Sequence, residues 1–505
     1  METFFSKYKF LFVALSAILS AYAFKEVNYV LSIVSLVPVI IAIKQIPLKK
    51  VFLYGFLFGS IYAIILCFWM FSAFVNYTNN NAVDMAIGFI AISILMFAFF
   101  YSMVFVGIAF ILNIHTNKNF LGWFQLIAIT AFWSLLEIAF MSFLNEYPFH
   151  NYRVGFAFTK NIFSIQWASF GGIEILTFFT VLVNVLLAKA IVSKQKLDIK
   201  ITVLAIVIIF LGGAILKATF TPQNINTPFK VSSISANMNV KDSWNQNKVN
   251  QLAENYFQLI KKQEVKTSDF IIFPESALPW TFYGKDDLLD EFQKRINPNT
   301  AIIIGLNTTE NEKDKSVKNT VFYFKNKQEL GRYQKEILIK GIEAPILGRA
   351  APFAGNAQYL VEKNRFKNKL FTTPFGKAGI LICNEAVISK HAIQQAQEGA
   401  NFFFNLSNDA WFKEQYITPH HFYNARLMSV ITRKDMVISN NCGYNAIIKG
   451  SGEIINKSKK NTKSNITGNL VANTSASLKT QYPLLFAILL NVFLIVSLFF
   501  LKKQN

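Results

Sequence analysis

Three side chains stand out because each follows a short apolar segment and because together they could form a thioester. Cys383 ends the segment Lys377-Ala-Gly-Ile-Leu-Ile-Cys383, and Glu275 follows Phe-Ile-Ile-Phe-Pro274. Lys335 lies between them along the chain. A thiol is a poor nucleophile until it loses its proton, so a catalytic cysteine needs a base and a cation nearby. A glutamate, a lysine and a cysteine in this order therefore indicate acyl chemistry.

Taken singly, each of these residues also has an ordinary explanation. One lysine among 50 basic residues is usually a solvated surface group, and a lone cysteine is more often a buried packing thiol. Pro274 cannot extend a strand ladder, so the chain turns there and presents the carboxylate of Glu275. The three residues are far enough apart along the chain to lie on separate strands of one sheet. The interpretation as a site for acyl chemistry therefore rests on the combination of the three residues.

The apolar residues are distributed unevenly along the chain. The sequence has 505 residues, of which 53% are hydrophobic. We predict a polytopic membrane domain of about seven spans at 1–220, a soluble domain at 228–475 and a C-terminal transmembrane helix at 483–501. The expected spans lie near 7–24, 28–43, 51–73, 86–112, 121–144, 163–192, 200–217 and 483–501.

The charge distribution predicts how the chain is oriented in the membrane. Lysines follow the second span at Lys44, Lys49 and Lys50, and the sixth span at Lys194 and Lys196. By the positive-inside rule both termini are cytoplasmic, and the soluble domain lies on the opposite side. The net charge of +21 is explained by basic loops and anionic lipid. Because no basic run with interleaved aromatics accompanies it, we expect no nucleic-acid binding.

Cysteine usage does not indicate a disulfide framework. The chain has three cysteines, and Cys67 falls inside a predicted span. A bridge could form only between Cys383 and Cys442, and it would remove the expected nucleophile.

Two pairs of ionisable residues have a structural and a functional interpretation. Glu137 and Glu174 fall inside predicted spans, where carboxylates are costly. They either line a site for a polar lipid headgroup or form hydrogen bonds between helices. His420 and His421 could suggest a metal site, but no further His or Cys cluster has ligand spacing. A helix start after Pro419 is the better interpretation, and we expect no metal.

Short apolar strands alternate with amphipathic helices through the soluble domain. This alternation predicts a layered α/β sandwich. Glu275, Cys383 and Asn408 each closely follow an apolar run, so three strand ends could form one site. The expected strands lie near 230–235, 269–273, 300–305, 319–324, 378–382, 401–406 and 436–440, and the expected helices near 247–262, 391–398 and 420–432.

Four motifs resemble those of the nitrilase superfamily, and within it the apolipoprotein N-acyltransferase family. They are Pro274-Glu-Ser-Ala-Leu-Pro279, Tyr333-Gln-Lys335, Ile382-Cys-Asn-Glu385 and Leu406-Ser-Asn-Asp-Ala-Trp-Phe412. The resemblance also covers the membrane layout. It implies a multi-span α-helical membrane domain plus an α/β nitrilase-like sandwich with α-β-β-α layers.

The resemblance also implies roles for individual residues. Glu275 matches the general base, Lys335 the cation that stabilises the oxyanion, and Cys383 the nucleophile. Trp244 matches a tryptophan that helps to seat the acceptor. The supporting or substrate-binding residues implied in this way are Glu343, Glu385, Trp244, Asn384 and Asn408.

Three departures from the family pattern concern acceptor binding and lipid preference more than the chemistry. Asn384 replaces the usual tyrosine after the nucleophile. The stretch Ile339-Lys-Gly-Ile-Glu343 replaces Val-Pro-Phe-Gly-Glu, and an arginine common after the glutamate matching Glu137 is absent.

The activity implied by the resemblance is transfer of a fatty acyl chain from a phospholipid to the N-terminal α-amine of a diacylglyceryl-cysteine lipoprotein. The expected partners are the phospholipid donor, the diacylated lipoprotein acceptor and the membrane. The expected location is the bacterial inner membrane, with the catalytic domain on the periplasmic side. We expect a monomer without metal or organic cofactor. The alternatives are a membrane-tethered amidohydrolase, in which water resolves the thioester, and a transporter or scaffold whose soluble domain only binds.

Overall fold

A computed structural model describes residues 8–77, 83–114, 122–149, 151–239, 244–309, 317–345, 370–412 and 415–503. Within these ranges, six helices are long and apolar enough to cross a membrane. The chain is therefore a multi-pass membrane protein. The six helices are α5 (Leu48–Tyr77), α6 (Val83–Asn113), α7 (Trp123–Phe143), α8 (Ala168–Ser193), α9 (Lys196–Thr219) and α16 (Leu485–Lys503).

The first two segments expected to span the membrane differ from the other six. The first forms α2 (Lys9–Lys25), a helix of 17 residues. The second is divided into α3 (Tyr29–Val34) and α4 (Val37–Ala42). Pro38 lies in the first turn of α4, where its missing N–H and fixed φ favour the start of a new helix. A helix of six residues is only about 9 Å long, so neither piece spans a bilayer alone.

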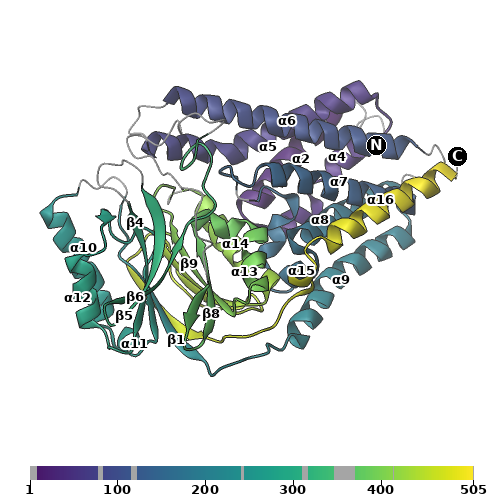
Figure 1. Cartoon of the computed structure of the whole chain (residues 1–505). Helices are drawn as coiled ribbons and strands as arrows, with labels where there is room; N and C mark the ends of the chain where they lie inside the picture. Colours follow the sequence, from purple (N-terminus) through teal and green to yellow (C-terminus); the bar gives the residue numbers. More distant parts are fainter. Residues whose placement is uncertain are drawn as a thin grey trace.

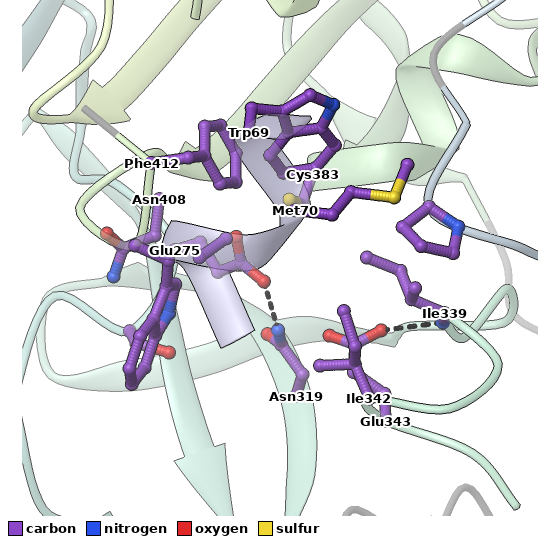
Figure 2. A pocket seen from close by; sticks show the side chains of 14 residues that line it. Trp69, Met70, Glu275, Asn319, Ile339, Ile342, Glu343, Cys383, Asn408 and Phe412 are labelled. Carbon is purple, nitrogen blue, oxygen red and sulfur yellow. Dashed lines mark hydrogen bonds between the residues drawn. The ribbon is translucent and has the colours of Figure 1, made fainter. Parts of the chain in front are cut away.

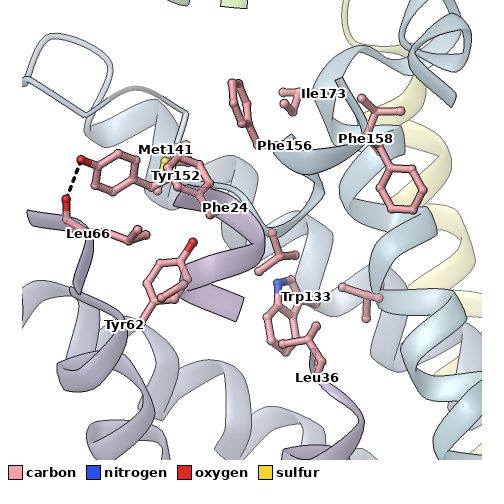
Figure 3. Close-up of a cluster of buried hydrophobic side chains, with 14 of the residues drawn as sticks. Phe24, Leu36, Tyr62, Leu66, Trp133, Met141, Tyr152, Phe156, Phe158 and Ile173 are labelled. Atoms are coloured by element: carbon pink, nitrogen blue, oxygen red, sulfur yellow. Dashed lines mark hydrogen bonds between the residues drawn. The ribbon is translucent and has the colours of Figure 1, made fainter. Parts of the chain in front are cut away.

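Aromatic packing and hydrogen bonds hold the membrane helices together. Figure 3 shows Phe24, Tyr62, Trp133 and Tyr152 among the buried side chains of this region. Glu137 of α7 accepts hydrogen bonds from the Val154 backbone N–H at 3.0 Å and from the Thr177 hydroxyl of α8 at 2.5 Å. Glu137 therefore joins two helices, as its structural interpretation predicts.

Glu174 of α8 joins the membrane helices to the end of the soluble domain. Its carboxylate lies 3.9 Å from an Arg153 guanidinium nitrogen and 3.4 Å from Lys479 Nζ in α15 (Leu478–Gln481). Two short 3₁₀ helices, η1 (Val154–Lys160) and η2 (Ser164–Trp167), precede α8.

Two six-strand sheet paths, one carrying an additional short strand, form the centre of the soluble domain. The first has the order β13-β1-β2-β4-β5-β6, with β3 paired to β4, and the second has the order β12-β11-β10-β9-β8-β7. Strands β1, β2 and β4 are mutually parallel, as are β8, β9 and β10. The strands of the first sheet are β1 (Phe229–Ser235), β2 (Phe270–Ile272), β3 (Thr281–Phe282), β4 (Ala301–Thr308), β5 (Lys318–Lys325), β6 (Gln328–Gln334) and β13 (Ser464–Leu470). Those of the second are β7 (Phe371–Thr373), β8 (Gly376–Ile382), β9 (Phe402–Asn408), β10 (Asp435–Asn441), β11 (Ala446–Ile448) and β12 (Ile454–Lys457).

Helices cover the outer face of each sheet, which confirms the predicted α-β-β-α layers (Figure 1). Phe229, Phe270 and Phe404 belong to the apolar core between the two sheets. Each buried aromatic side chain contributes about 1.5–3 kcal/mol to folding. The helices over the first sheet are α10 (Gln246–Ile260), α11 (Gln263–Lys266) and α12 (Asp287–Arg295); those over the second are α13 (Ser389–Gln397) and α14 (Ile417–Thr432).

The second helical layer also joins the soluble domain to the membrane helices (Figure 1). The Tyr416 hydroxyl, at the start of α14, donates a hydrogen bond to the Leu66 carbonyl of α5 at 2.5 Å. It also contacts the Tyr152 hydroxyl at 3.2 Å, and Trp69 Nε1 donates to that same hydroxyl at 2.6 Å. The soluble domain is thus hydrogen-bonded to the side of α5.

The two segments that connect the soluble domain to α9 and α16 run side by side. Ile225 N donates to the Ala472 carbonyl at 3.0 Å, and Thr474 N donates to the Gln223 carbonyl at 2.9 Å. This paired connection continues into the domain, where β1 and β13 are antiparallel neighbours. The chain therefore enters and leaves the domain at one place.

Candidate functional site

Glu275 lies in a turn that follows β2 and remains hydrogen-bonded to β4. Ala277 N donates to the Gly305 carbonyl at 2.8 Å, and Gly305 N donates to the Pro274 carbonyl at 3.2 Å. A Cβ atom on Gly305 would lie 2.7 Å from Glu275 Cα. The missing side chain at Gly305 therefore allows the turn to approach β4 and fixes where the carboxylate points.

Lys335 follows β6 and lies between two carboxylates. Its Nζ is 2.7 Å from Glu343 Oε1 and 3.7 Å from Glu275 Oε1, and its side chain is fully buried. Asn319 Nδ2 donates a hydrogen bond to Glu275 Oε1. The structure thus brings together Glu275, Lys335 and Glu343 from separate parts of the first sheet and its connections.

Cys383 lies where β8 ends and the 3₁₀ helix η3 (Cys383–Val387) begins. Its φ of +51° is in the left-handed region. For a residue with a side chain this conformation costs about 1–2 kcal/mol, so surrounding contacts must hold it. The residue is only 9% exposed, and it lines the same cavity as Glu275 and Glu343.

Glu385 ties the turn at Cys383 to the end of β6. Its carboxylate accepts hydrogen bonds from Ile382 N at 2.8 Å and from Glu336 N at 2.7 Å. It also accepts from Ile337 N at 3.2 Å and from the Tyr333 hydroxyl at 3.2 Å. β6 and β8 belong to different sheets. The Glu385 carboxylate therefore fixes the position of Cys383, after β8, relative to Lys335, after β6.

The charges of the site favour proton transfer within it. Burial raises the pKa of the Cys383 thiol, Glu275 raises it further, and Lys335 opposes both. Burial also raises the pKa of Glu275, against the effect of Lys335. Burial alone would lower the pKa of Lys335, but Glu343 and Glu275 outweigh it and raise the value, so the amine stays charged. Passing the thiol proton to Glu275 leaves the net charge of the site unchanged, whereas losing it to solvent would add a buried negative charge.

An apolar cavity of about 920 Å³, mouth included, lies beside the cysteine. Figure 2 shows Trp69, Met70 and Phe412 on one side of Cys383, with Glu275 and other polar groups on the opposite side. Trp69 and Met70 belong to the membrane helix α5. The described residues that line the cavity are Trp69, Met70, Ala73, Pro148, Glu275, Ser276, Asn319, Ile339, Ile342, Glu343, Cys383, Asn408, Trp411 and Phe412.

The remaining residues expected from the sequence have different positions. Asn408 lines the cavity, where its Oδ1 accepts hydrogen bonds from Ala410 N at 3.2 Å and Asn441 Nδ2 at 3.0 Å. Asn384 Nδ2 donates to the Ile337 carbonyl at 3.1 Å, so this side chain supports the loop after Lys335. Trp244 is 38% exposed and lines a separate polar depression with Lys248. The structure therefore does not place Trp244 in the Cys383 cavity.

Several residues of the site were missed from the sequence. Asn319, which bonds Glu275, was recognised only as the start of a strand. Trp69 and Met70 gave no signal beyond an apolar span, because their place in the cavity beside Cys383 depends on the packing of two distant segments. His421 was assigned only to a helix, although its ring nitrogens lie 2.8 Å from Asp409 Oδ1 and 2.9 Å from the Cys383 carbonyl.

Two family models match consecutive parts of the chain. The model described as carbon-nitrogen hydrolase matches residues 230–480, and the model described as apolipoprotein N-acyltransferase N-terminal domain matches residues 16–186. The chain belongs to the apolipoprotein N-acyltransferase family. The matched residues include Glu275, Lys335 and Cys383 and the membrane helices α5 to α7, together with most of α8.

Relatives from the same family cover different shares of the chain. The apolipoprotein N-acyltransferase of Haemophilus ducreyi is 27% identical over 305 residues, which is 58% of this chain and 59% of the relative. That of Geobacter metallireducens is 24% identical over 466 residues, which is 88% and 86%. The match thus spans about three fifths of the first relative and most of the second. Among solved structures, Saccharomyces cerevisiae Nit3, a member of branch 10 of the nitrilase superfamily, matches at 15% identity with a TM-score of 0.37, covering 49% of this chain and 91% of Nit3.

Proposed function

We propose that this protein transfers a fatty acyl chain from a phospholipid to the N-terminal α-amine of a diacylglyceryl-cysteine lipoprotein, through a thioester on Cys383. One observation carries the proposal. Cys383 and Glu275 line a single apolar cavity, Lys335 Nζ lies 3.7 Å from Glu275 Oε1, and part of the cavity wall is a membrane helix. A nucleophile in such a cavity can meet an acyl chain without exposing the chain to water. Family membership supports the same reaction class.

In the first half-reaction, Glu275 takes the proton of Cys383 and the thiolate attacks an ester carbonyl of the phospholipid. The carbonyl oxygen becomes an oxyanion, which Lys335 Nζ and the backbone N–H of Asn384 stabilise. The C–O bond to the glycerol breaks, and the leaving alkoxide takes the proton held by Glu275. The products are a thioester on Cys383 and a lysophospholipid.

In the second half-reaction, the uncharged α-amine of the lipoprotein attacks the thioester carbonyl. Glu275 removes a proton from the attacking nitrogen, and the same two donors hold the oxyanion. The C–S bond breaks, and the proton on Glu275 returns to the sulfur. An amide forms and the enzyme regains its starting state, so these residues complete the cycle without a metal or an organic cofactor.

Glu343 holds the cation in place during both steps. It accepts from Lys335 Nζ at 2.7 Å and from Ile339 N at 3.0 Å. A fixed ammonium needs no reorganisation when negative charge develops on the substrate, which is the condition for strong oxyanion stabilisation.

Transfer of a labelled acyl chain tests the proposal. The full-length protein is incubated with phospholipid carrying a radiolabelled acyl chain and with a diacylated lipopeptide. We expect the label on the lipopeptide amine, and an added acyl mass on the peptide that contains Cys383. Cys383→Ser should abolish both signals. Cys442→Ser should retain them, because Cys442 is also buried in this domain but is absent from the cavity lining. Release of the label only as free fatty acid would indicate an amidohydrolase instead.

We also propose that the soluble domain faces the periplasm of the bacterial inner membrane and that both termini are cytoplasmic. The distribution of lysines around the helices supports this orientation. Lys285→Cys places a thiol on the exposed surface of the domain, and Lys49→Cys places one at the exposed start of α5. A membrane-impermeant maleimide should label only the first variant in intact spheroplasts; labelling of only the second would reverse the orientation.

A further inference from the structure

His421 is buried between two hydrogen-bond acceptors. The residue lies in α14 and is 2% exposed. One ring nitrogen, Nε2, is 2.9 Å from the Cys383 carbonyl oxygen, which can only accept a hydrogen bond. The other, Nδ1, is 2.8 Å from Oδ1 of Asp409, and an ionised carboxylate also only accepts. Both contacts are satisfied when both ring nitrogens carry a proton.

We propose that His421 is a positioning residue whose doubly protonated ring, paired with Asp409, holds the Cys383 carbonyl and so keeps this cysteine in its left-handed conformation. In that conformation the thiol faces the cavity that Glu275 also lines. The consequence for acyl transfer rests on the proposed function. The consequence for the reactivity of the Cys383 thiol is independent of the proposed function.

The strained backbone at Cys383 explains why such a contact is needed. A left-handed residue with a side chain persists only when its surroundings hold it. On the N-terminal side, Ile382 N donates to Glu385. On the C-terminal side, the Cys383 carbonyl contacts the His421 ring. The first contact holds Ile382, the residue before the cysteine, and the second holds the peptide group that follows the cysteine Cα.

Asp409 is itself anchored, so it can fix the orientation of the ring. It is fully buried, and its backbone N donates to the Asn441 carbonyl at 2.8 Å and to Asn440 Oδ1 at 3.1 Å. Both partners lie at the end of β10. A carboxylate held on a strand end faces one ring nitrogen, and this leaves the other nitrogen directed at the Cys383 carbonyl.

The charges around the ring agree with a protonated state. Burial alone would lower the pKa of His421, but the carboxylate of Asp409 outweighs it, with smaller help from the Cys383 carbonyl and Glu275, and the value is raised. The neighbouring His420 faces a backbone carbonyl, that of Lys25, rather than a carboxylate. Burial lowers its pKa to about 3, and its ring stacks on Phe156. The pKa values of two adjacent histidines of one helix are therefore shifted in opposite directions.

The first test measures the reactivity of Cys383 without any lipid substrate. The full-length protein in detergent is treated with iodoacetamide, and the rate of alkylation at Cys383 is followed by mass spectrometry of the intact protein and its peptides. His421→Ala should slow alkylation by roughly tenfold to a hundredfold, because a hydrogen bond from a charged donor is lost. His421→Gln should restore part of the rate, because an amide N–H can still donate to the carbonyl.

The matched control is His420→Gln, a substitution at the adjacent buried histidine that bonds the Lys25 carbonyl and not the cysteine. This variant should react at the wild-type rate. Thermal unfolding of each variant shows whether it is folded. A folded His421→Ala protein that is alkylated as fast as wild type would overturn the proposal, as would a His420→Gln protein slowed to the same extent.

The second test observes the proton directly and does not depend on a destabilised variant. The protein contains five histidines, and nitrogen-15 labelling of their rings distinguishes imidazolium from neutral imidazole by NMR. We expect an imidazolium signal at pH 7 that disappears in His421→Gln. Asp409→Asn should also remove this signal while slowing alkylation less than His421→Ala, because a neutral ring can still donate from Nε2. A neutral His421 in the unmodified protein would overturn the proposal.

The two tests remain informative if the proposed function is wrong. Neither uses a phospholipid or a lipopeptide, so absence of acyl transfer in the wild-type protein would refute the proposed function alone. Conversely, unchanged alkylation in folded His421→Ala would refute the positioning role and leave acyl transfer through Cys383 in place.

Discussion

Replacing Lys335 separates its structural contribution from its chemical one. The ammonium is fully buried and lies 2.7 Å from Glu343 and 3.7 Å from Glu275. Lys335→Met leaves two buried carboxylates without a cation. Breaking a buried pair in this way costs about 3–5 kcal/mol of folding free energy. The loss of one oxyanion donor costs about 3 kcal/mol of transition-state stabilisation, which slows acyl transfer by roughly two to three orders of magnitude.

A double variant distinguishes these two effects. In Lys335→Met with Glu343→Gln, one of the stranded charges becomes a neutral amide, and Glu275 can take up a proton because the group that most opposes the effect of its burial, Lys335, is gone. The double variant should therefore recover most of the lost stability, since neutral replacements of buried ion pairs are usually tolerated. It should not recover the rate, because the oxyanion still lacks its cation.

The measurements are thermal unfolding in detergent and single-turnover formation of the acyl-enzyme, followed by intact-mass spectrometry. Glu343→Gln alone is the control for the carboxylate. Recovery of the rate together with stability in the double variant would refute the reasoning, because Lys335 would then act only through the fold.

Three further predictions concern the neighbours of Glu275, Lys335 and Cys383. Glu343→Gln removes a negative charge that raises the pKa of Glu275, and leaves Lys335 to act on Glu275 alone. The pKa of Glu275 should fall, the acid limb of the pH–rate profile should move to lower pH, and a shift to higher pH would contradict the assignment. Gly305→Ala places a Cβ 2.7 Å from Glu275 Cα, and should destabilise the protein by roughly 1–3 kcal/mol and displace the carboxylate; normal unfolding together with a normal acylation rate would disprove this. Met70→Trp should reduce the rate with long-chain acyl donors by roughly tenfold or more relative to short-chain donors, and equal effects on both in an acylation assay would show that the acyl chain does not lie along α5.

Local sequence patterns predicted the layers of the soluble domain and the strand ends that carry its polar groups. Apolar runs of strand length ended close to Glu275, Cys383 and Asn408, and in the structure all three line one cavity. The pairing of β13 with β1 was not predicted, because it joins residues more than 200 positions apart and no local pattern encodes it. Pro38 favours a helix start within the second expected span, where the structure has two short helices. The continuous apolar run around Pro38 instead favoured a single span.

The part of the site that came from the membrane domain was beyond sequence reasoning. Trp69 and Met70 look like any apolar residues of a span, and their role as cavity wall follows only from the packing of α5 against the catalytic domain. His421 shows the same limit. A histidine on a helix reveals its function only when Asp409 and the Cys383 carbonyl are seen on either side of its ring. Trp244 shows the reverse, because motif matching gave it a role and the structure places it elsewhere.

The paired connection between Gln223–Ile225 and Ala472–Thr474 has a mechanical consequence. A domain joined to the membrane helices by a single flexible linker can rotate and change its distance from the lipid surface. Two connecting segments that are hydrogen-bonded to each other resist twisting. They therefore keep the domain at a constant distance from the membrane and in a constant orientation. Molecules that diffuse laterally in the bilayer would then always reach the mouth of the Cys383 cavity at the same depth.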